Sequence, residues 1–199
     1  MSKTGFFDGS YNLPMIIRDP RPSANATRGT VVEQYSEAVD VLPTICEAFG
    51  LPVPPAVDGR SLLPFLEGTA DASLWKDAAH FEFHFHDDAA RLGLNPYDCT
   101  LCVLRGERYK YVQFAVPGWP PLLFDLQNDP HESEQPRISP LILQFQGPSK
   151  RNRLVTVANI ASDPANAALV LESATEMLRW RVSTLSSPPH NSATWSPQG

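Results

Sequence analysis

The stretch CTLCVLRGERYKYVQFAVPGWPPLLFDL, residues 99–126, decides the fold. Apolar and aromatic runs at 99–104 and 108–116 flank Arg105-Gly106-Glu107, a combination that is typical of a β-hairpin. A third apolar run, residues 122–126, follows a proline-containing loop. Three short strands joined by short connections predict an antiparallel meander over residues 99–126.

Residues 79–86 alternate strictly between two kinds of side chain. On a strand, alternate residues share a face, so the three phenylalanines lie on one side. The opposite side carries four candidate metal ligands: His80, Glu82, His84 and His86. Imidazoles two residues apart can bind one divalent metal, and a carboxylate can complete the coordination shell. The alternative interpretation is a polar strand face that lines a cleft or a subunit contact.

Two stretches predict helices. Residues 40–49 begin with Asp40 as a cap and end before Gly50. Five apolar residues of this helix fall at i, i+4 spacing on one face: Val41, Leu42, Ile45, Cys46 and Phe49. Residues 164–185 follow Asp163 as a cap and begin with a proline. The apolar stripe of this second helix consists of Leu169, Val170, Met177, Leu178 and Val182.

Proline separates the remaining elements. The chain has 20 prolines in 199 residues, which excludes a long helical bundle because proline interrupts helices. Short buried strands are predicted at residues 13–18 and 30–32, and a short apolar element at 61–66 that ends at Gly68.

Charge and cysteine content exclude several classes of function. The net charge is −6, with 16 basic and 22 acidic residues, so a nucleic-acid-binding surface is not expected. No apolar run reaches the 18 or so residues of a membrane span. Three cysteines do not make a disulfide framework, and a reducing, cytoplasmic compartment is favoured. Cys99 and Cys102 fall on opposite faces of the predicted strand, which favours packing over redox chemistry.

Seven segments occur in the order in which one known family has them: GFFDGSY (5–11), PMIIRDP (14–20), EAVDVLPTI (37–45), DGRSLLPFL (58–66), WKDAAHFE (75–82), YKYV (109–112), and LFDL (123–126) with NDP (128–130). Together they resemble the C-terminal part of a sulfatase in the alkaline phosphatase superfamily. The branch that they resemble most contains phosphonate monoester hydrolases and arylsulfatase-like enzymes. Residues 157–185 resume the resemblance through the family's N-L-A-x-D-P stretch and terminal helix.

The resemblance implies an α/β fold: the C-terminal part of an alkaline phosphatase-like sandwich, with a small antiparallel sheet and a terminal helix. Residues 1–75 would be the end of the α/β catalytic domain, and residues 76–185 a subdomain that carries the sheet. Residues 133–156 have no counterpart in the family, which indicates an inserted loop or a retained intron. Residues 186–199 are expected to be a disordered tail.

The family hydrolyses small-molecule sulfate or phosphonate esters with a formylglycine made from a C/S-x-P-x-R motif. A divalent metal, calcium or manganese, is held by Asp, Asn and His residues. None of the cysteines in this sequence has proline two residues on and arginine four residues on, and the Asp-His-Gly-Glu segment is absent. We therefore expect a fragment that is inactive alone and binds no metal through the family site.

One position of the family's active site does match. Lys3, in Ser2-Lys3-Thr4-Gly5, aligns with a lysine that contacts the sulfuryl or phosphoryl oxygens in the family. Two other interpretations of the chain stay open. It could be a separate metal- or partner-binding module that uses the His80/Glu82/His84/His86 face, or a non-functional product of a truncated gene. Exchange of the terminal helix between subunits would give a homo-oligomer.

Overall fold

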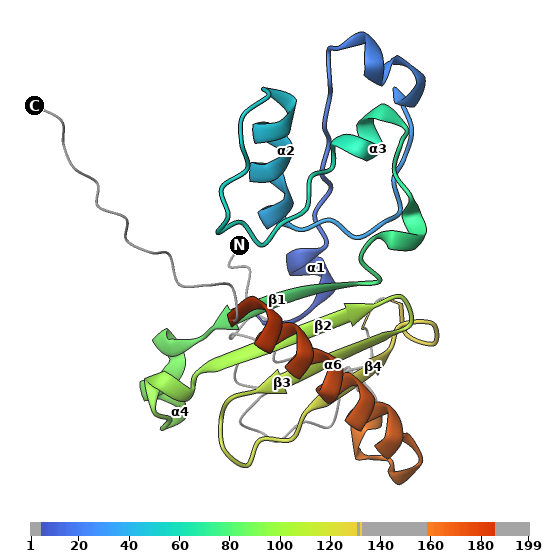
Figure 1. Ribbon diagram of the computed structural model, residues 1–199. Coiled ribbons are helices and arrows are strands. Elements are labelled where there is room, and N and C mark those ends of the chain that lie inside the picture. The colour runs from blue at the N-terminus through green and yellow to red at the C-terminus, as the bar shows by residue number, and fades with distance from the viewer. Residues whose placement is uncertain (1–4, 131, 133–158, 186–199) are drawn as a thin grey trace, which may run out of the picture. The chain divides into compact units, whose positions relative to one another are not determined.

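The computed structural model describes residues 5–130, 132 and 159–185 (Figure 1). The chain divides into two units. One takes in residues 1–17 and 76–177, and the other residues 18–75 and 178–199. Lys3, the expected insertion at 133–156 and the expected tail at 186–199 lie outside the described residues.

The first unit is built on one antiparallel sheet of four strands in the order β1-β2-β3-β4. The strands are β1 (Ala78–His84), β2 (Thr100–Gly106), β3 (Tyr109–Phe114) and β4 (Leu122–Asp125). The predicted meander is confirmed, with its tight turn at residues 107–108, and β1 adds a fourth strand next to β2. The register places Val103 opposite Val112 and Val112 opposite Leu122, so one row of apolar side chains crosses the sheet.

One face of the sheet is covered by the N-terminal segment and by the short helix α4 (Ala89–Leu92). Phe6 packs edge-on against Phe114, with 6.2 Å between ring centroids, and lies 5.8 Å from the ring of Phe124. The helix α1 (Asp8–Tyr11) follows directly. Phe81, Phe83 and Phe85 join this core, so the predicted common face of the three phenylalanines is confirmed.

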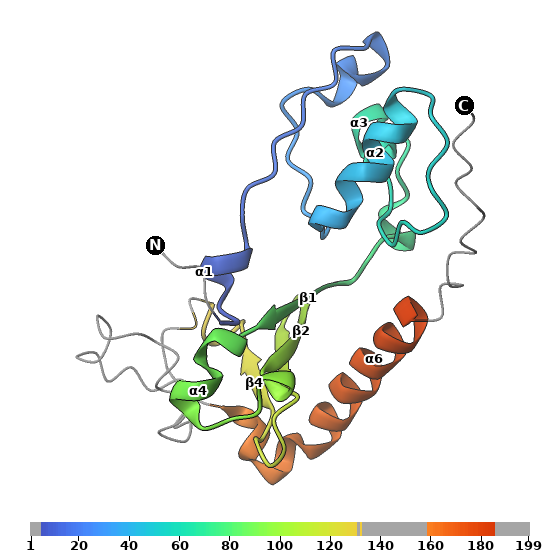
Figure 2. The same ribbon diagram turned by 90° about the vertical axis from the view of Figure 1, so that its left-hand side faces the viewer.

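The other face of the sheet is covered by α6 (Ala167–Leu185), which runs alongside it in Figure 2. Met177, Leu169 and Val170 pack against sheet residues that include Leu104, Tyr111 and Leu123. The predicted helix at 164–185 is thus confirmed. Its predicted stripe is wrong at Leu178 and Val182, which are exposed. At 3.6 residues per turn, these two positions fall beyond the arc that faces the sheet.

Asn159 joins α6 to the edge of the sheet. Its side-chain oxygen accepts a hydrogen bond from the backbone N–H of Leu123 at 3.0 Å, and its amide nitrogen donates to the carbonyl of Pro121 at 3.2 Å. Asp163 then caps the turn before the helix by accepting a hydrogen bond from the N–H of Ala165. The Asn and Asp of the sequence NIASDP, residues 159–164, therefore have structural roles.

The second unit contains α2 (Val41–Ala48) and α3 (Leu63–Glu67). The predicted helix at 40–49 is confirmed, and α3 ends at Gly68 as expected. The strands predicted at 13–18 and 30–32 are wrong, because both stretches lie outside any helix or strand. A strand needs a neighbouring strand for its backbone hydrogen bonds, and no strand of the described part of the chain pairs with either stretch.

Asp40 organises the second unit. It is fully buried, and its carboxylate accepts hydrogen bonds from the backbone N–H groups of Glu37 and Arg60, both at 2.8 Å. The prediction that Asp40 caps α2 is right in position but wrong in bonding, because its side chain makes no hydrogen bond to the first turn of that helix. Thr44 adds a second link, since its hydroxyl accepts from the N–H of Leu62.

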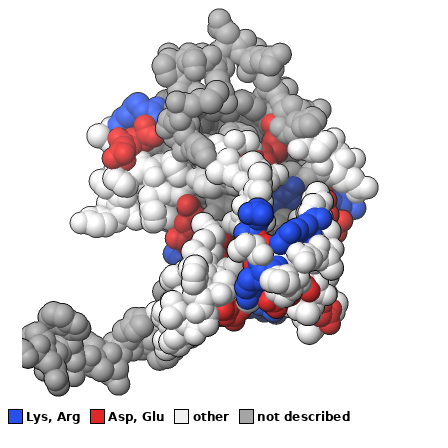
Figure 3. Space-filling view, turned by 90° about the horizontal axis from the view of Figure 1, so that it is seen from above, with Lys and Arg blue, Asp and Glu red and all other residues white. Residues whose placement is uncertain are grey.

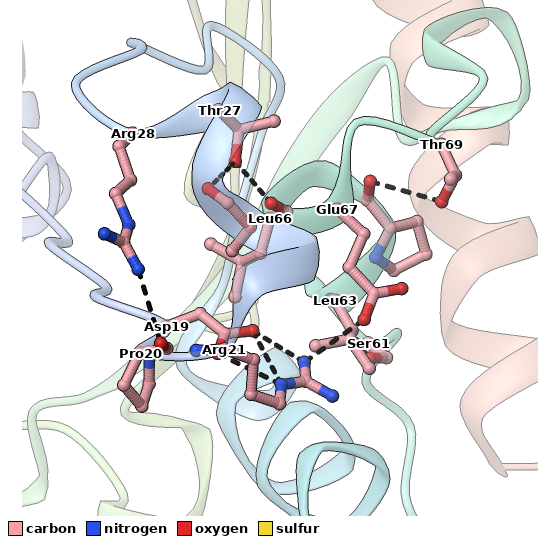
Figure 4. A network of polar contacts seen from close by, with 12 residues as sticks. Asp19, Pro20, Arg21, Thr27, Arg28, Ser61, Leu63, Leu66, Glu67 and Thr69 are labelled. Atoms are coloured by element: carbon pink, nitrogen blue, oxygen red, sulfur yellow. Dashed lines mark hydrogen bonds and ion pairs between the residues drawn. The ribbon is translucent and has the colours of Figure 1, made fainter.

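A polar network ties the loop before α2 to α3 (Figure 4). Arg21 pairs with Asp19, with 2.6 Å between Nη2 and Oδ2, and with Glu67 at 3.2 Å. The hydroxyl of Thr27 donates to the carbonyl of Leu66. The Thr27–Leu66 hydrogen bond joins residues 39 positions apart, so the network connects two segments that are distant in the sequence.

The surface carries both signs of charge. Figure 3 shows acidic and basic side chains intermingled on the face in view, in agreement with a modest net charge of −6. Of the helices that the structure describes, none combines the length and apolar character that a membrane span requires.

Candidate functional site

Four ionisable side chains meet where the N-terminal segment crosses the sheet: Asp8, Arg105, Lys110 and Glu132. We call them the buried ionic cluster. The ammonium of Lys110 is completely buried and lies 2.9 Å from the carbonyl oxygen of Phe6 and 3.2 Å from Oδ1 of Asp8. It also pairs with Oε1 of Glu132. Nε of Arg105 lies 3.2 Å from Oδ2 of Asp8.

The sheet register explains why the two cations are neighbours. Arg105 on β2 and Lys110 on β3 are paired across the ladder. Alternation along β3 puts Lys110 on the same face as Val112, which points into the core. Like charges directly opposite each other destabilise a sheet. Asp8 offsets this repulsion because each of its carboxylate oxygens contacts one of the two cations.

Glu132 is the fourth member of the buried ionic cluster and contacts both Lys110 and the backbone of Asp8. Its Oε2 accepts a hydrogen bond of 2.7 Å from the backbone N–H of Asp8. Asp8 is therefore held through both its backbone and its carboxylate. Glu132 has a positive φ of 47°, which is uncommon for a residue other than glycine. Such a conformation persists where surrounding contacts hold it in place, and the contacts to Asp8 and Lys110 do so here.

The electrostatics of the cluster follow from burial. Burial lowers the pKa of Lys110 from its usual 10.5 to about 8, and the negative charge of Asp8 acts in the opposite direction. Lys110 is thus largely charged at pH 7. Two cations face two carboxylates, so the cluster is balanced in charge. Its chemical role is to fasten residues 6–8 to the sheet, and these residues follow Lys3 closely in the sequence.

The motifs found in the sequence assign no role to Lys110 or Glu132. A signal for Lys110 was present, because it alternates with Val112 and Phe114 on a strand and so takes an inward position. A charged residue at an inward position requires a buried partner. The sequence does not indicate which carboxylate supplies it, because Asp8 and Lys110 are 102 residues apart.

The four candidate metal ligands are only partly brought together. His80, Glu82 and His84 lie on one face of β1, opposite Leu104, Cys102 and Thr100 of β2 respectively. His86 lies beyond the end of the strand, in a short 3₁₀ helix. The strand ends because Phe85 turns into the core, where its N–H donates to the carbonyl of Cys99 at 2.8 Å.

His84 and His86 each contact one nearby polar side chain. Nδ1 of His84 lies 2.9 Å from the hydroxyl of Thr100, and Nε2 of His86 lies 3.3 Å from Oδ1 of Asp87. Within residues 5–130, 132 and 159–185, no three or more His, Cys, Asp or Glu side chains are placed to hold a metal ion together. The described residues therefore do not fit the metal that the resemblance implies, and we derive no catalytic step from one.

Cys99 and Cys102 lie on opposite sides of the sheet, as the sequence predicts. Cys99 is buried in the core under the N-terminal segment, and Cys102 packs toward α6. Burial raises the pKa of the Cys99 thiol, with smaller contributions from Asp98 and Asp88. A raised pKa makes a thiol less reactive, which agrees with a packing role.

Comparison with known proteins gives one family. Residues 2–147 match the family described as N-sulphoglucosamine sulphohydrolase, C-terminal. The multifunctional alkaline phosphatase superfamily protein PehA of Trinickia caryophylli is 39% identical over 188 residues, which cover 92% of this chain and 31% of that protein. Arylsulfatase K of Xenopus laevis is 31% identical over 137 residues, which cover 65% of this chain and 23% of that protein.

Solved structures agree with the sequence matches. The phosphonate monoester hydrolase of Agrobacterium radiobacter superposes with a TM-score of 0.72 at 38% identity, over 92% of this chain and 32% of that one. The corresponding enzyme of Silicibacter pomeroyi gives a TM-score of 0.60 at 31% identity, over 78% of this chain and 27% of that one. The chain thus spans a third or less of the length of the relatives that it matches.

Proposed function

This chain belongs to the family described as N-sulphoglucosamine sulphohydrolase, C-terminal, in the alkaline phosphatase superfamily, and we propose that it is the C-terminal part of a sulfate or phosphonate monoester hydrolase. The observation that carries the proposal is the match to the Agrobacterium phosphonate monoester hydrolase over 92% of this chain. Shared identity of 38% with a TM-score of 0.72 supports a common fold and a common kind of site.

Lys3 is the residue of this chain that we assign to the substrate. Its resemblance to the family's anion-contacting lysine supports the assignment, and the chemistry is suitable because an ammonium stabilises charge on sulfuryl or phosphoryl oxygens. The buried ionic cluster fastens Phe6 and Asp8, which lie three and five residues after Lys3. We infer that the cluster limits the positions that Lys3 can reach.

Sulfatases depend on a metal, and the described residues offer no group that would hold one. The sequence also contains no C/S-x-P-x-R motif for the nucleophile. We therefore propose that the metal ligands and the nucleophile come from the part of the enzyme that corresponds to the unmatched two thirds of the relatives. On this account the 199-residue chain alone does not turn over substrate.

The test is an assay of the purified chain with an aryl sulfate and with a phosphonate monoester, each with added Ca²⁺ or Mn²⁺. We expect the rate to equal that of the Lys3→Ala variant and of buffer. Turnover by the wild-type chain above the Lys3→Ala control would show that the chain carries its own catalytic centre and would overturn the proposed inactivity.

A further inference from the structure

The N-terminal segment is fixed to the sheet at Phe6, three residues after Lys3. Phe6 is buried, and its ring packs against the rings of Phe114 and Phe124. A ring in the core still allows the backbone beside it to rotate. The carbonyl oxygen of Phe6 limits that rotation, because it accepts a hydrogen bond of 2.9 Å from Nζ of Lys110. The side chain and the peptide group of Phe6 are therefore both held.

Lys110 can act as a fixed point because several groups hold its ammonium. Lys110 is completely buried and pairs with the carboxylates of Asp8 and Glu132. Its Nζ also lies 5.2 Å from the centroid of the Phe124 ring, within the range of a cation–π contact. The strand β3 that carries Lys110 lies between β2 and β4 in the sheet. The donor that holds the carbonyl of Phe6 is thus itself well anchored.

Gly5 links this fixed point to Lys3. Its φ of 91° is a value that glycine adopts readily and other residues rarely do. A Cβ added at this position would lie 3.9 Å from Cδ2 of Phe7, which is an ordinary contact, so the backbone angle rather than lack of space favours glycine. Three residues of chain span at most about 11 Å, and the Cα of Lys3 therefore lies within that distance of the Cα of Phe6.

We propose that Lys110 is a positioning residue, which acts on the substrate through Lys3. This inference rests on the proposed function, in which Lys3 contacts sulfuryl or phosphoryl oxygens. Lys110 is completely buried, so its contribution is to hold Phe6 and the turn at Gly5 in one arrangement. The ammonium of Lys3 then starts from a fixed point of the chain. A displacement of about 1 Å in a group that contacts the substrate can reduce the rate about a hundredfold.

The experiment uses a hybrid in which this chain replaces the matching part of the Agrobacterium enzyme, with a phosphonate monoester as substrate. Lys110→Met and Lys3→Ala are made singly and together, and kcat and KM are measured for each variant. Arg108→Met is the matched control. Arg108 is a cation two residues before Lys110, and its pair with Asp125 is exposed on the arginine side.

A positioning residue has no further effect once the group that it positions is gone. Lys110→Met should lower kcat/KM by roughly tenfold to a hundredfold, and Lys3→Ala by about a hundredfold or more. The double variant should be no worse than Lys3→Ala alone, because the two residues act as one unit. Arg108→Met should leave kcat/KM unchanged. Losses that multiply in the double variant would show that Lys110 acts independently of Lys3 and would overturn the proposal.

The separate effects on KM and kcat distinguish positioning from a loss of stability. Partial unfolding of the hybrid lowers the concentration of active enzyme, so it reduces the apparent kcat and leaves KM unchanged. Positioning predicts that Lys110→Met changes KM and kcat in the same directions as Lys3→Ala. A fall in kcat alone, where Lys3→Ala also raises KM, would assign Lys110 a purely structural role and overturn the proposal.

Asp8→Asn is a milder second variant for the case that Lys110→Met prevents folding of the hybrid. It removes one of the two carboxylates that hold the ammonium of Lys110 and leaves Glu132 in place. We expect a smaller loss of kcat/KM that again disappears in the Lys3→Ala background, and a loss that persists there would overturn the proposal. Asp88→Asn is the control, because the Arg91–Asp88 pair is exposed on both sides.

The wild-type hybrid tests the proposed function separately. A folded wild-type hybrid without activity would overturn the proposed function, and the role of Lys110 with it. An active wild-type hybrid in which the effects of Lys110→Met and Lys3→Ala multiply would support the proposed function and overturn the positioning role alone. An active hybrid in which the two effects do not add supports both.

Discussion

The sheet unit and residues 18–75 differ in how they use apolar side chains. Both faces of the sheet are covered, and Val112, Leu122 and Leu123 have no exposed surface. In residues 18–75, Ile45 and Phe49 are large, apolar and exposed. The comparison indicates that the sheet unit buries its large apolar side chains, whereas residues 18–75 leave several of theirs exposed.

The two regions also differ in how they use charge. The sheet unit buries Lys110 and balances it with Asp8 and Glu132. Residues 18–75 have the Arg21–Asp19 pair, whose arginine is partly exposed. A buried charge is costly unless it is paired, while an exposed pair contributes little. Substitutions should therefore have very different effects in the two regions.

The largest effect is expected for Lys110→Met. The variant leaves the buried carboxylate of Glu132 without its cation and leaves Asp8 with Arg105 alone, and we expect it to lower the free energy of unfolding by about 3–5 kcal/mol. Arg108→Met is the control, because the Arg108–Asp125 pair is exposed on its arginine side and should contribute at most about 1 kcal/mol. Urea unfolding of both variants measures the difference. Similar losses for the two would contradict a special role for the buried ionic cluster.

The next largest loss of stability is expected when a buried leucine is replaced, and an exposed leucine provides the comparison. Leu123→Ala removes a fully buried side chain and should cost about 2–5 kcal/mol. Leu42→Ala makes the same change at an exposed position of α2 and should cost less than about 0.5 kcal/mol. Thermal or urea unfolding measures both. A cost for Leu42→Ala as large as that for Leu123→Ala would contradict the difference in burial between the two side chains.

Asp40→Ala tests the organisation of residues 18–75. It leaves the partly buried N–H groups of Glu37 and Arg60 without their acceptor, and we expect a loss of about 1–3 kcal/mol. Asp58→Ala, an exposed carboxylate in the same region, serves as the control and should be nearly neutral. Amide hydrogen exchange reads out the effect on α2. If α2 exchanges at the same rate in both variants, Asp40 does not hold the helix in place.

The smallest effect concerns pH. The pKa of Lys110 is lowered to about 8 in the folded chain, so the folded state releases this proton near pH 8 and the unfolded state near 10.5. Between these values the unfolded state binds more protons, and the contribution of Lys110 to stability rises with pH by about 1 kcal/mol per unit. Unfolding free energies of wild type and Lys110→Met at pH 7, 8 and 9.5 give this contribution as their difference. A difference that stays constant or decreases as the pH rises would contradict the lowered pKa of Lys110.

Local sequence patterns correctly predict the strands and helices whose formation depends on neighbouring residues. The strands of the meander follow from apolar runs and turn residues, and the helices from Asp40, Pro43, Asp163 and Pro164 near their starts. The strand predicted at 79–86 ends two residues earlier than expected, at His84, since Phe85 leaves the ladder to fill the core.

Features that depend on distant contacts were predicted poorly. The strand predicted at 13–18 is wrong because a strand needs a neighbouring strand. Of the apolar face on the helix at 40–49 only Cys46 is buried, because burial depends on what packs against the helix. The buried ionic cluster joins residues about a hundred positions apart, which no local pattern encodes. Lys3, whose assignment depends on the family resemblance, stays a prediction.

The most direct test of the account uses a hybrid in which this chain replaces the matching part of the Agrobacterium enzyme. The catalytic activity of the hybrid is compared with that of the 199-residue chain, with a phosphonate monoester as substrate and under the same metal conditions. The account predicts turnover by the hybrid, a loss of that turnover in the hybrid with Lys3→Ala, and none by the chain alone. A correctly folded hybrid without activity, or activity in the isolated chain, would contradict it.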